Sequence, residues 1–391
     1  MIRPCECERT GRRWSTTSTI CRNIAVLAPM IVLPLDADAA RRCCPHDELR
    51  QRQSPDRMTD TVRPAARKAR PRKRPQADVE IPRDVDSATL AVDGRDVRLT
   101  NLRKIFWPEL ALTKRDLLQY YATIAPELLP HLAHRAMVMK RYPNGAAGDC
   151  FFMKRAPEPR PEWIETCSIT HGSGNVIAFP IVQDLSSLLW LVNLGCIDLN
   201  PWYARCDDVD RPDYLHFDLD PVPPATFDDV RATALAVREA LESLDMPTYV
   251  KTTGSKGVHV YVPIVRGPTQ KQVWTLAKQL AFALAKRRPE LMTAEYRIAK
   301  RPAGRVLVDY NQNAWGRTLA SVYSPRPKPR ASVSTPITWE ELAGGATIED
   351  FRIDNVPQRI AGLGDLWAPV SAPHGRFDLA RVLDALVAAK R

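Results

Sequence analysis

Cysteine spacings that bind metal or build a disulfide framework are missing from this sequence. Five of the nine cysteines lie before residue 45, and the other four, Cys150, Cys167, Cys196 and Cys206, form no CxxC pair. Neither a zinc site nor a disulfide framework is therefore indicated. Free cysteines suit a reducing cytoplasm, and we expect the protein to be cytoplasmic.

The sequence also lacks an apolar run long enough to span a bilayer. The candidate is residues 24–35, which follow several arginines and imitate a secretory signal. This run is too short to cross a membrane, and Pro29 and Pro34 interrupt it. We therefore expect no membrane partner. We interpret residues 1–57 as an extension that is not native, with Met58 as the true start.

Acidic residues are too few to balance the basic ones. The chain has 45 Asp and Glu against 56 Lys and Arg, a formal net charge of +11. This charge favours a polyanionic partner, nucleic acid above all, because phosphates attract basic surfaces and release counterions. The alternative is a soluble protein with a basic tail. Residues 63–74 contain seven basic residues and no acidic one, so we expect a disordered arm that is either simply solvated or attracts DNA.

Periodic segments predict where the chain folds. We expect a basic extension over 1–85 and one folded domain over 86–391. Strand-like runs and amphipathic helical runs are mixed without strict βαβ alternation, which predicts an α+β fold with a mixed or antiparallel sheet flanked by helices. The expected strands are 214–220, 249–252, 258–262 and 306–310, after a hairpin around Asp93-Gly94, and the expected helices begin near Thr113, 228, 269 and 379.

Three carboxylates stand out within the expected strands. Strand 214–220 alternates, so its apolar residues share one face while Asp218 and Asp220 share the other, roughly 7 Å apart. An Asp-x-Asp pair alone would also suit a solvated strand end. Asp309, inside the apolar run 306–310, adds a third acid where an unpaired charge is costly. Three acids on neighbouring strands suit two-metal phosphoryl transfer.

Residues 252–259 form a glycine-containing turn between two of these strands. Glycines let backbone amides approach phosphate, while Lys256 and His259 add charge and hydrogen-bond donors. The turn is not a P-loop, because GxxxxGK[ST] is absent. It is either a polar hairpin with a surface lysine or, as we favour beside three acids, a triphosphate-binding loop.

Two adjacent aromatic residues precede another basic pair. Phe151 and Phe152 lie just before Lys154-Arg155, which suggests a platform for base stacking with electrostatic support. The alternative is one core and one surface aromatic.

Four motifs together resemble the polymerase domain of bacterial DNA ligase D, within the archaeo-eukaryotic primase superfamily. The resemblance covers about residues 99–367. It rests on 99–104 (LTNLRK) with 113–114 (TK), 217–221 (FDLDP), 254–259 (GSKGVH) and 308–310 (VDY), in the family's order. It implies a primase-like fold and a non-homologous end-joining polymerase that adds nucleotides, often ribonucleotides, at broken ends.

The resemblance also implies roles for individual residues. Asp218, Asp220 and Asp309 match the ligands of two Mn²⁺ or Mg²⁺ ions, and a nucleoside triphosphate is the implied substrate. Thr253, Ser255, Lys256 and His259 match the incoming-nucleotide loop, with Gln312 and Arg326 near it. Asn101, Lys104 and Lys114 match a pocket for the 5′-phosphate of the downstream strand, and Phe151 and Phe152 match aromatics that stack on DNA.

The sequence departs from the family pattern in a few places. Asn200 stands where many relatives have histidine, residues 322–325 replace a more usual Ala-Pro-Tyr-Ser, and His216 replaces an aliphatic residue. Triphosphate contacts near the first two are thereby in doubt. We expect His216 to be tolerated and not to tune the site.

Other functions share parts of this pattern. A primase would use the same fold and acids, a metal-dependent nuclease would gain little from the GSKGxH loop, and an inactive DNA-end scaffold would not need all three acids. No Lys-x-Asp-Gly adenylation motif is present, so we expect no fused ligase module. Double-stranded DNA ends or gaps with a 5′-phosphate, a Ku-like end binder and a separate DNA ligase are the implied partners, in association with the nucleoid.

Overall fold

The computed structural model describes residues 79–383. Met58, the basic arm and most of the last expected helix lie outside this range, and residues 380–383 are helical. Residues before the expected domain boundary at 85/86 already pack: Ile81 is fully buried and its backbone N–H and C=O bond to Gln119 and Arg115. The domain boundary itself stays a prediction. No helix among the described residues is long and apolar enough to cross a membrane.

A six-stranded sheet carries the acidic residues. Its order is β13-β14-β10-β12-β11-β15, and every neighbouring pair is antiparallel except β13 and β14. The predicted α+β class is therefore confirmed, as are the four predicted strands. The strands are β10 (Tyr214–Pro221), β11 (Tyr249–Thr252), β12 (Val258–Pro263), β13 (Met292–Thr293), β14 (Val306–Asp309) and β15 (Pro336–Ile337).

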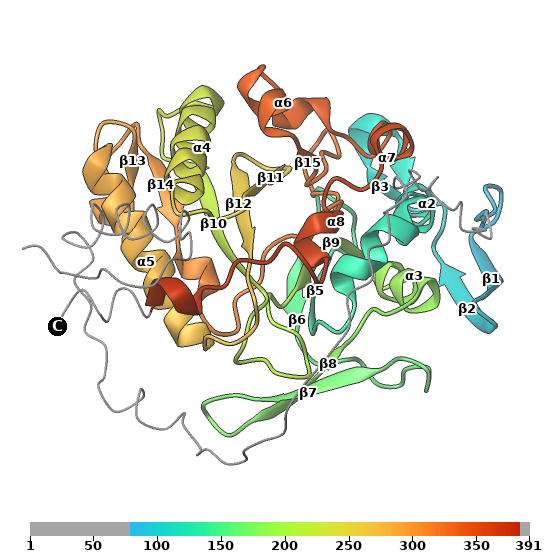
Figure 1. Ribbon diagram of the computed structural model, residues 1–391. Helices are drawn as coiled ribbons and strands as arrows, with labels where there is room; N and C mark the ends of the chain where they lie inside the picture. Colours follow the sequence, from blue (N-terminus) through green and yellow to red (C-terminus); the bar gives the residue numbers. More distant parts are fainter. Residues whose placement is uncertain (1–78, 384–391) are drawn as a thin grey trace, which may run out of the picture. The chain divides into compact units, whose positions relative to one another are not determined.

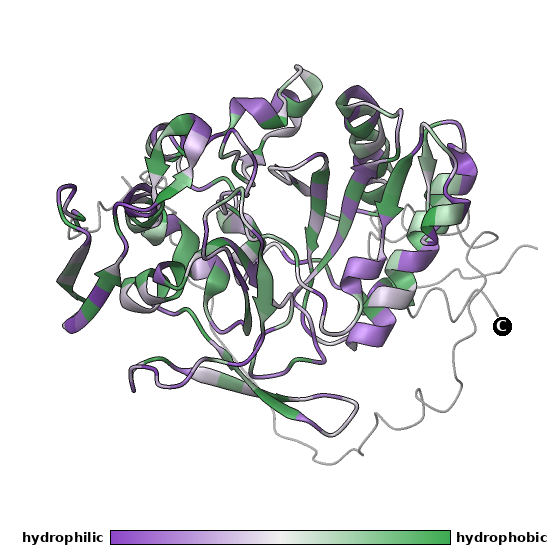
Figure 2. Cartoon of the chain, turned by 180° about the vertical axis from the view of Figure 1, so that it is seen from behind, coloured by the Kyte–Doolittle hydropathy of each residue, from purple (hydrophilic) through white to green (hydrophobic). Residues whose placement is uncertain are grey.

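Two long helices pack against this sheet because each has one apolar face and a capped start. α4 (Phe227–Glu242) contacts β10 and β12, and α5 (Gln270–Arg287) contacts β10, β13 and β14 (Figure 1). The capping box predicted between Thr269 and Gln272 is present at the start of α5. Figure 2 shows both hydrophobic and hydrophilic colour along the helices and the central strands, as expected of elements with one buried face. Phe217 of β10 is fully buried.

A second, three-stranded sheet has the order β6-β5-β9. It consists of β5 (Met137–Arg141), β6 (Phe151–Met153) and β9 (Cys196–Pro201), and the sequence patterns did not predict it. The segment after β14 joins the two sheets, because the amide of Ser321 donates to the carbonyl of Leu199 on β9 at 2.8 Å. The remaining hairpins are β1 (Ser87–Val92) with β2 (Arg95–Thr100), β3 (Ile105–Trp107) with β4 (Leu112–Thr113), and β7 (Thr166–Thr170) with β8 (Val176–Pro180).

Helix α2 (Lys114–Leu132) packs against α3 (Leu185–Asn193) beside the second sheet (Figure 1). As predicted, Thr113 caps α2: its side chain accepts a hydrogen bond from the amide of Asp116, whose carboxylate accepts one from the Thr113 amide. Helix α3 was not predicted, although Asp184 and Ser187 form a capping box there. The short C-terminal helices are α6 (Trp339–Ala343), α7 (Val356–Leu363) and α8 (Ala368–Ser371), and the 3₁₀ turns are η3 (Pro108–Leu110), η4 (Ile298–Lys300), η5 (Asn311–Asn313) and η6 (Ile348–Asp350).

Candidate active site

The three acidic side chains predicted as a group come from neighbouring strands. Asp218 of β10 lies directly opposite Asp309 of β14, and Asp220 lies two residues further along β10 on the same face. Together with Gln312, they line an open pocket of about 460 Å³. Strand pairing therefore brings the carboxylates to one place, as the sequence predicted.

Burial and mutual repulsion make the charged forms of these acids costly. Burial raises the pKa of Asp218 to about 6, although Lys251, Arg326 and Lys256 oppose this. Burial and the neighbouring Asp218 raise the pKa of Asp220 to about 6. Burial also raises the pKa of Asp309. These raised pKa values show that too little positive charge lies near the three carboxylates to stabilise their charged forms.

Each carboxylate lies beside a polar side chain or amide of its own. Asp218 Oδ1 lies 3.2 Å from His259 Nε2, and Asp220 Oδ2 lies 3.4 Å from Lys256 Nζ. Asp309 accepts hydrogen bonds from the Asn311 amide at 2.7 Å and from Gln312 Nε2 at 3.0 Å. Consequently no three acidic, histidine or cysteine side chains within residues 79–383 already converge on a point that could hold a metal ion.

The donor set nevertheless fits a divalent cation. Carboxylate oxygens are the ligands that Mg²⁺ and Mn²⁺ prefer, and Asp218 Oδ1 is buried without a hydrogen-bond partner. An ion would supply the positive charge that this cluster lacks, once the side chains turned toward it.

The loop 252–259 is organised by the side chain of Thr253. Its Oγ1 accepts hydrogen bonds at 3.1–3.2 Å from the amides of Ser255, Lys256 and Gly257. These three amides are therefore already bonded to Thr253, and binding of a triphosphate by the loop stays a prediction. A Cβ on Gly257 would lie 1.9 Å from the carbonyl oxygen of Leu219, so only glycine fits against β10.

Other predicted nucleotide-binding residues border the same place. His259 lies opposite Asp218 on β12 and is 2% exposed, while the Lys256 side chain is 59% exposed at the rim. Burial lowers the pKa of His259 well below its usual value, so the imidazole is neutral. Arg326 reaches the loop from the segment after η5, where its Nη1 donates to the Thr253 carbonyl at 2.8 Å.

The predicted phosphate-binding residues lie at the start of α2. Lys114 is the first residue of that helix, its Nζ donates to the Thr100 carbonyl at 2.7 Å, and its amide donates to the Lys104 carbonyl. Burial, followed by the charges of Lys104 and Arg141, lowers the pKa of Lys114 to about 8. Asn101 precedes them with a positive φ of 56°. The structure thus gathers two lysines and Arg141 beside a helix N-terminus, where the helix dipole favours anions. The amides of Lys114, Arg115 and Asp116 themselves already donate to protein acceptors.

Strand β6 exposes both predicted aromatic residues. Phe151 is 43% exposed and Phe152 is 65% exposed, so the alternative of one core and one surface aromatic is wrong. They pair with Arg141 and Lys140 of β5, respectively, and each cation lies over its partner's ring at 5.3 and 5.6 Å. Because side chains alternate along a strand, Phe151 with Arg141 and Phe152 with Lys140 occupy opposite faces of the hairpin.

Several residues at the site were not predicted. Tyr296, Arg297 and Ile298 line the pocket of the acids, as does Arg301. Lys251 and Asp198 are buried charges, each 1% exposed, within apolar strands. An acid inside an apolar run was the signal that identified Asp309, and the same signal at 196–199 would have identified Asp198.

The residues that depart from the family pattern are also placed. Asn200 is buried, and its Nδ2 donates to the carbonyl of Asp198 at 3.1 Å. Ser324 accepts a hydrogen bond from the Leu199 amide at 2.8 Å. His216 is 1% exposed and stacks on Tyr261, and burial lowers its pKa to about 3, so it is a neutral core residue.

The chain is similar to known proteins over this part of its sequence. The family model described as LigD, primase-polymerase domain, matches residues 113–367. The multifunctional non-homologous end joining protein LigD of Mycolicibacterium smegmatis is 36% identical over 278 residues, which cover 71% of this chain and 36% of that protein. The bifunctional LigD of Bacillus subtilis is 31% identical over 271 residues, 68% of this chain and 43% of that protein. The chain therefore spans less than half the length of these relatives.

A solved structure shows the same fold. The polymerase domain of Mycobacterium tuberculosis ligase D, in complex with DNA, aligns with a TM-score of 0.66 and 31% identity, over 70% of this chain and 98% of that domain. The expected primase-like fold is therefore confirmed, and so is the resemblance on which it rested. The chain belongs to the LigD primase-polymerase domain family and is an enzyme of the DNA-directed, metal-dependent nucleotidyltransferase class.

Proposed function

We propose that this chain adds nucleotides, directed by a template strand, at DNA breaks or gaps during non-homologous end joining. The observation that carries this proposal is the pairing of Asp218 with Asp309 across β10 and β14, with Asp220 on the same face at an open pocket. Three acids on a rigid sheet are what phosphoryl transfer between a hydroxyl and a triphosphate requires.

The chain's own residues have distinct roles in this reaction. Asp218, Asp220 and Asp309 would hold two Mn²⁺ or Mg²⁺ ions, which supply positive charge for the attacking hydroxyl and the departing pyrophosphate. Thr253 shapes the nucleotide loop through its Oγ1 bonds. We assign the nucleoside triphosphate to the space bordered by Ser255, Lys256, His259, Gln312 and Arg326.

DNA would contact the face that carries β6 and the start of α2. The related domain from M. tuberculosis was solved in complex with DNA, which supports a DNA substrate here. We assign the 5′-phosphate of the downstream strand to Asn101, Lys104 and Lys114, and base stacking to Phe151 and Phe152. A compact dianion beside two lysines and a helix N-terminus gains charge-assisted hydrogen bonds.

The relatives are named as multifunctional or bifunctional end-joining proteins. On this basis we also propose that the chain acts with a Ku-like end binder and a DNA ligase, in association with the nucleoid. Co-purification of the chain with each candidate, with and without broken DNA, tests this part of the proposal.

The proposal is tested by extension of a gapped, 5′-phosphorylated duplex with each nucleoside triphosphate and with Mg²⁺ or Mn²⁺. We expect template-directed addition at the gap. Synthesis on single-stranded templates without a primer would instead identify a primase. Absence of addition to gaps and breaks under every combination of metal and nucleotide would contradict the proposal.

A further inference from the structure

Asp198 is a fully enclosed carboxylate on β9, the strand next to β5. Asp198 is 1% exposed, and its carboxylate lies between two cations. Asp198 Oδ2 is 3.8 Å from Lys140 Nζ and 3.7 Å from Arg326 Nε. A buried carboxylate is tolerated only when it is compensated, so these cations are required where they are.

The two cations come from different parts of the fold. Lys140 belongs to β5 and lies over the ring of Phe152, on the face of the hairpin turned away from Arg141. Arg326 donates to the carbonyl of Thr253, at the base of the nucleotide loop. Asp198 therefore connects the stacking residue Phe152 with that loop, through Lys140 on one side and Arg326 on the other.

The contacts hold the cations without consuming their hydrogen-bond donors. Both distances exceed the 2.7–2.9 Å or so that is typical of charge-assisted hydrogen bonds. In the part of the chain that the structure describes, Arg326 Nε and Asp198 Oδ1 are buried without hydrogen-bond partners. Coulomb attraction falls off slowly with distance, so it still draws both cations toward Asp198.

This arrangement suits a site that receives a polyanion. Lys140 and Arg326 would repel each other if the carboxylate between them lost its charge, and only the bond from Arg326 Nη1 to the Thr253 carbonyl would then keep Arg326 beside the loop. A triphosphate that arrived beside Lys140 and Arg326 would find both cations already in place, with no donor of either spent on a hydrogen bond to Asp198. Such preorganisation lowers the cost of binding.

We propose that Asp198 is a positioning residue, which holds Lys140 and Arg326 ready for the triphosphate of the incoming nucleotide without touching the nucleotide itself. The inference rests on the proposed function, since it concerns the substrate of that reaction. It adds Lys140 to the residues that we assign to binding of the triphosphate. It also assigns a reason for the acid in the apolar segment 196–199 of β9.

The test is steady-state extension of a gapped, 5′-phosphorylated duplex at varied nucleoside triphosphate concentration. Asp198→Asn keeps the shape of the side chain and removes its charge. KM for the nucleotide should then rise about tenfold, which corresponds to the free energy of one charge-assisted hydrogen bond at the lower end of its range. The turnover number and the affinity for the DNA should each change by a factor of less than about three. Asp198→Glu, which retains the charge, should recover part of the loss.

A double-mutant cycle shows whether Asp198 acts through its neighbours. Lys140→Gln alone should also raise KM, and in that background Asp198→Asn should raise KM by a smaller factor than in the wild type, because one of the two cations is gone. Equal factors in both backgrounds would overturn the inference. If Asp198→Asn does not fold, the KM of Lys140→Gln decides: an unchanged KM would overturn it as well.

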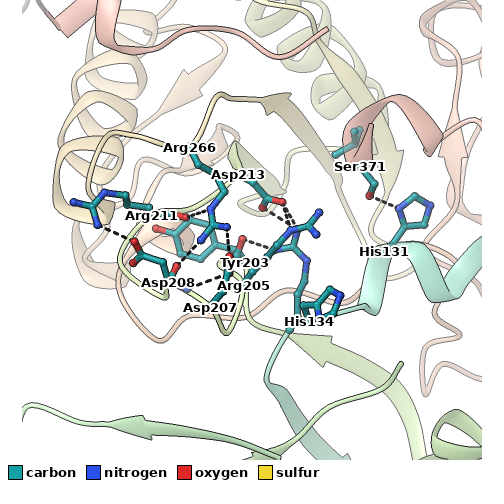
Figure 3. Close-up of polar contacts among 12 residues, drawn as sticks. His131, His134, Tyr203, Arg205, Asp207, Asp208, Arg211, Asp213, Arg266 and Ser371 are labelled. Atoms are coloured by element: carbon teal, nitrogen blue, oxygen red, sulfur yellow. Dashed lines mark hydrogen bonds and ion pairs between the residues drawn. The ribbon is translucent and has the colours of Figure 1, made fainter. Parts of the chain in front are cut away.

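Asp213 is a matched control, because it is another buried aspartate between two cations. Its Oδ2 lies 2.9 Å from Arg205 Nε and 2.7 Å from Arg135 Nη2. Figure 3 shows Asp213 within this cluster of polar side chains. It lies just before β10, at the end of that strand opposite Asp220. Asp213→Asn should lower the melting temperature and leave KM for the nucleotide unchanged.

The outcomes separate the inference from the proposed function. An equal rise of KM in the Asp198 and Asp213 variants would show a general effect of losing a buried charge, and would overturn the positioning role. Extension by the wild type with an unchanged KM in Asp198→Asn would overturn it too. A wild type that extends no substrate would instead contradict the proposed function.

Discussion

Asp218 and Asp309 lie directly opposite each other on the antiparallel strands β10 and β14. On the other side of β10, His259 lies opposite Asp218, and Lys251 lies opposite His259 on β11. Four strands thus place two acids, a neutral imidazole and a lysine in one row across the sheet. Because register fixes this row, single side chains in it can be tested without moving the backbone.

The lysines at the start of α2 should recognise the 5′-phosphate. Lys104→Ala and Lys114→Ala should each lower gap filling on a 5′-phosphorylated substrate by a factor of about 10 or more, at about 1.5–3 kcal/mol per charge-assisted bond. The same substitutions should hardly affect a substrate that ends in a 5′-hydroxyl. Equal losses on both substrates would show that the lysines bind the DNA backbone in general.

This recognition should depend on pH through Lys114. Its pKa of about 8, lowered by burial and then by Lys104 and Arg141, means that the ammonium group is charged at pH 7 and loses its proton as the pH rises through 8. The preference for 5′-phosphate over 5′-hydroxyl ends should therefore decline between pH 7 and pH 9. Arg141→Gln removes one repelling cation and should move this decline to higher pH. A preference that stays constant over this range would contradict the assignment of Lys114.

The two faces of the β5–β6 hairpin should separate functionally. Phe152 shares its face with Lys140, so Phe152→Ala should raise KM for the nucleotide. Phe151 shares the opposite face with Arg141, so Phe151→Ala should weaken binding of the gapped DNA. Each loss should be about 1–3 kcal/mol, the usual contribution of one stacked base. Identical profiles for the two variants, in both KM and DNA affinity, would show that the faces are not distinct.

The nucleotide loop should not tolerate a side chain at Gly257. An alanine Cβ there would press on the carbonyl oxygen of Leu219, between the two catalytic acids of β10. We expect Gly257→Ala to lower the melting temperature and to reduce extension at saturating nucleotide. Gly172→Ala is the matched control, because no atom lies within 4 Å of a Cβ at that position. A Gly257→Ala protein as stable and active as this control would contradict the close approach.

Local patterns predicted the catalytic sheet because its strands alternate or are uniformly apolar. Residues 214–220 showed both faces of β10, and the caps at Thr113 and Thr269 showed where α2 and α5 begin. The second sheet was missed because β6 has only three residues and the other partner of β5, the strand β9, is far away in sequence. The spacing of apolar residues within a segment does not predict pairing with a strand far away in sequence.

The site was predicted as groups of residues, and the contacts between the groups came from the structure. The sequence could not show that the Thr253 hydroxyl occupies the loop amides, because that depends on the turn's backbone geometry. Nor could it show that Asp198 lies between Lys140 and Arg326, which are 186 residues apart in the chain and meet only through tertiary packing.

The most direct measurement of the central claim is primer extension at a gapped, 5′-phosphorylated duplex by the wild type and by three variants, Asp218→Ala, Asp220→Ala and Asp309→Ala. If the acids hold two metal ions, each substitution should abolish extension while DNA binding stays largely intact. Full activity in any one of these variants would contradict the two-metal account.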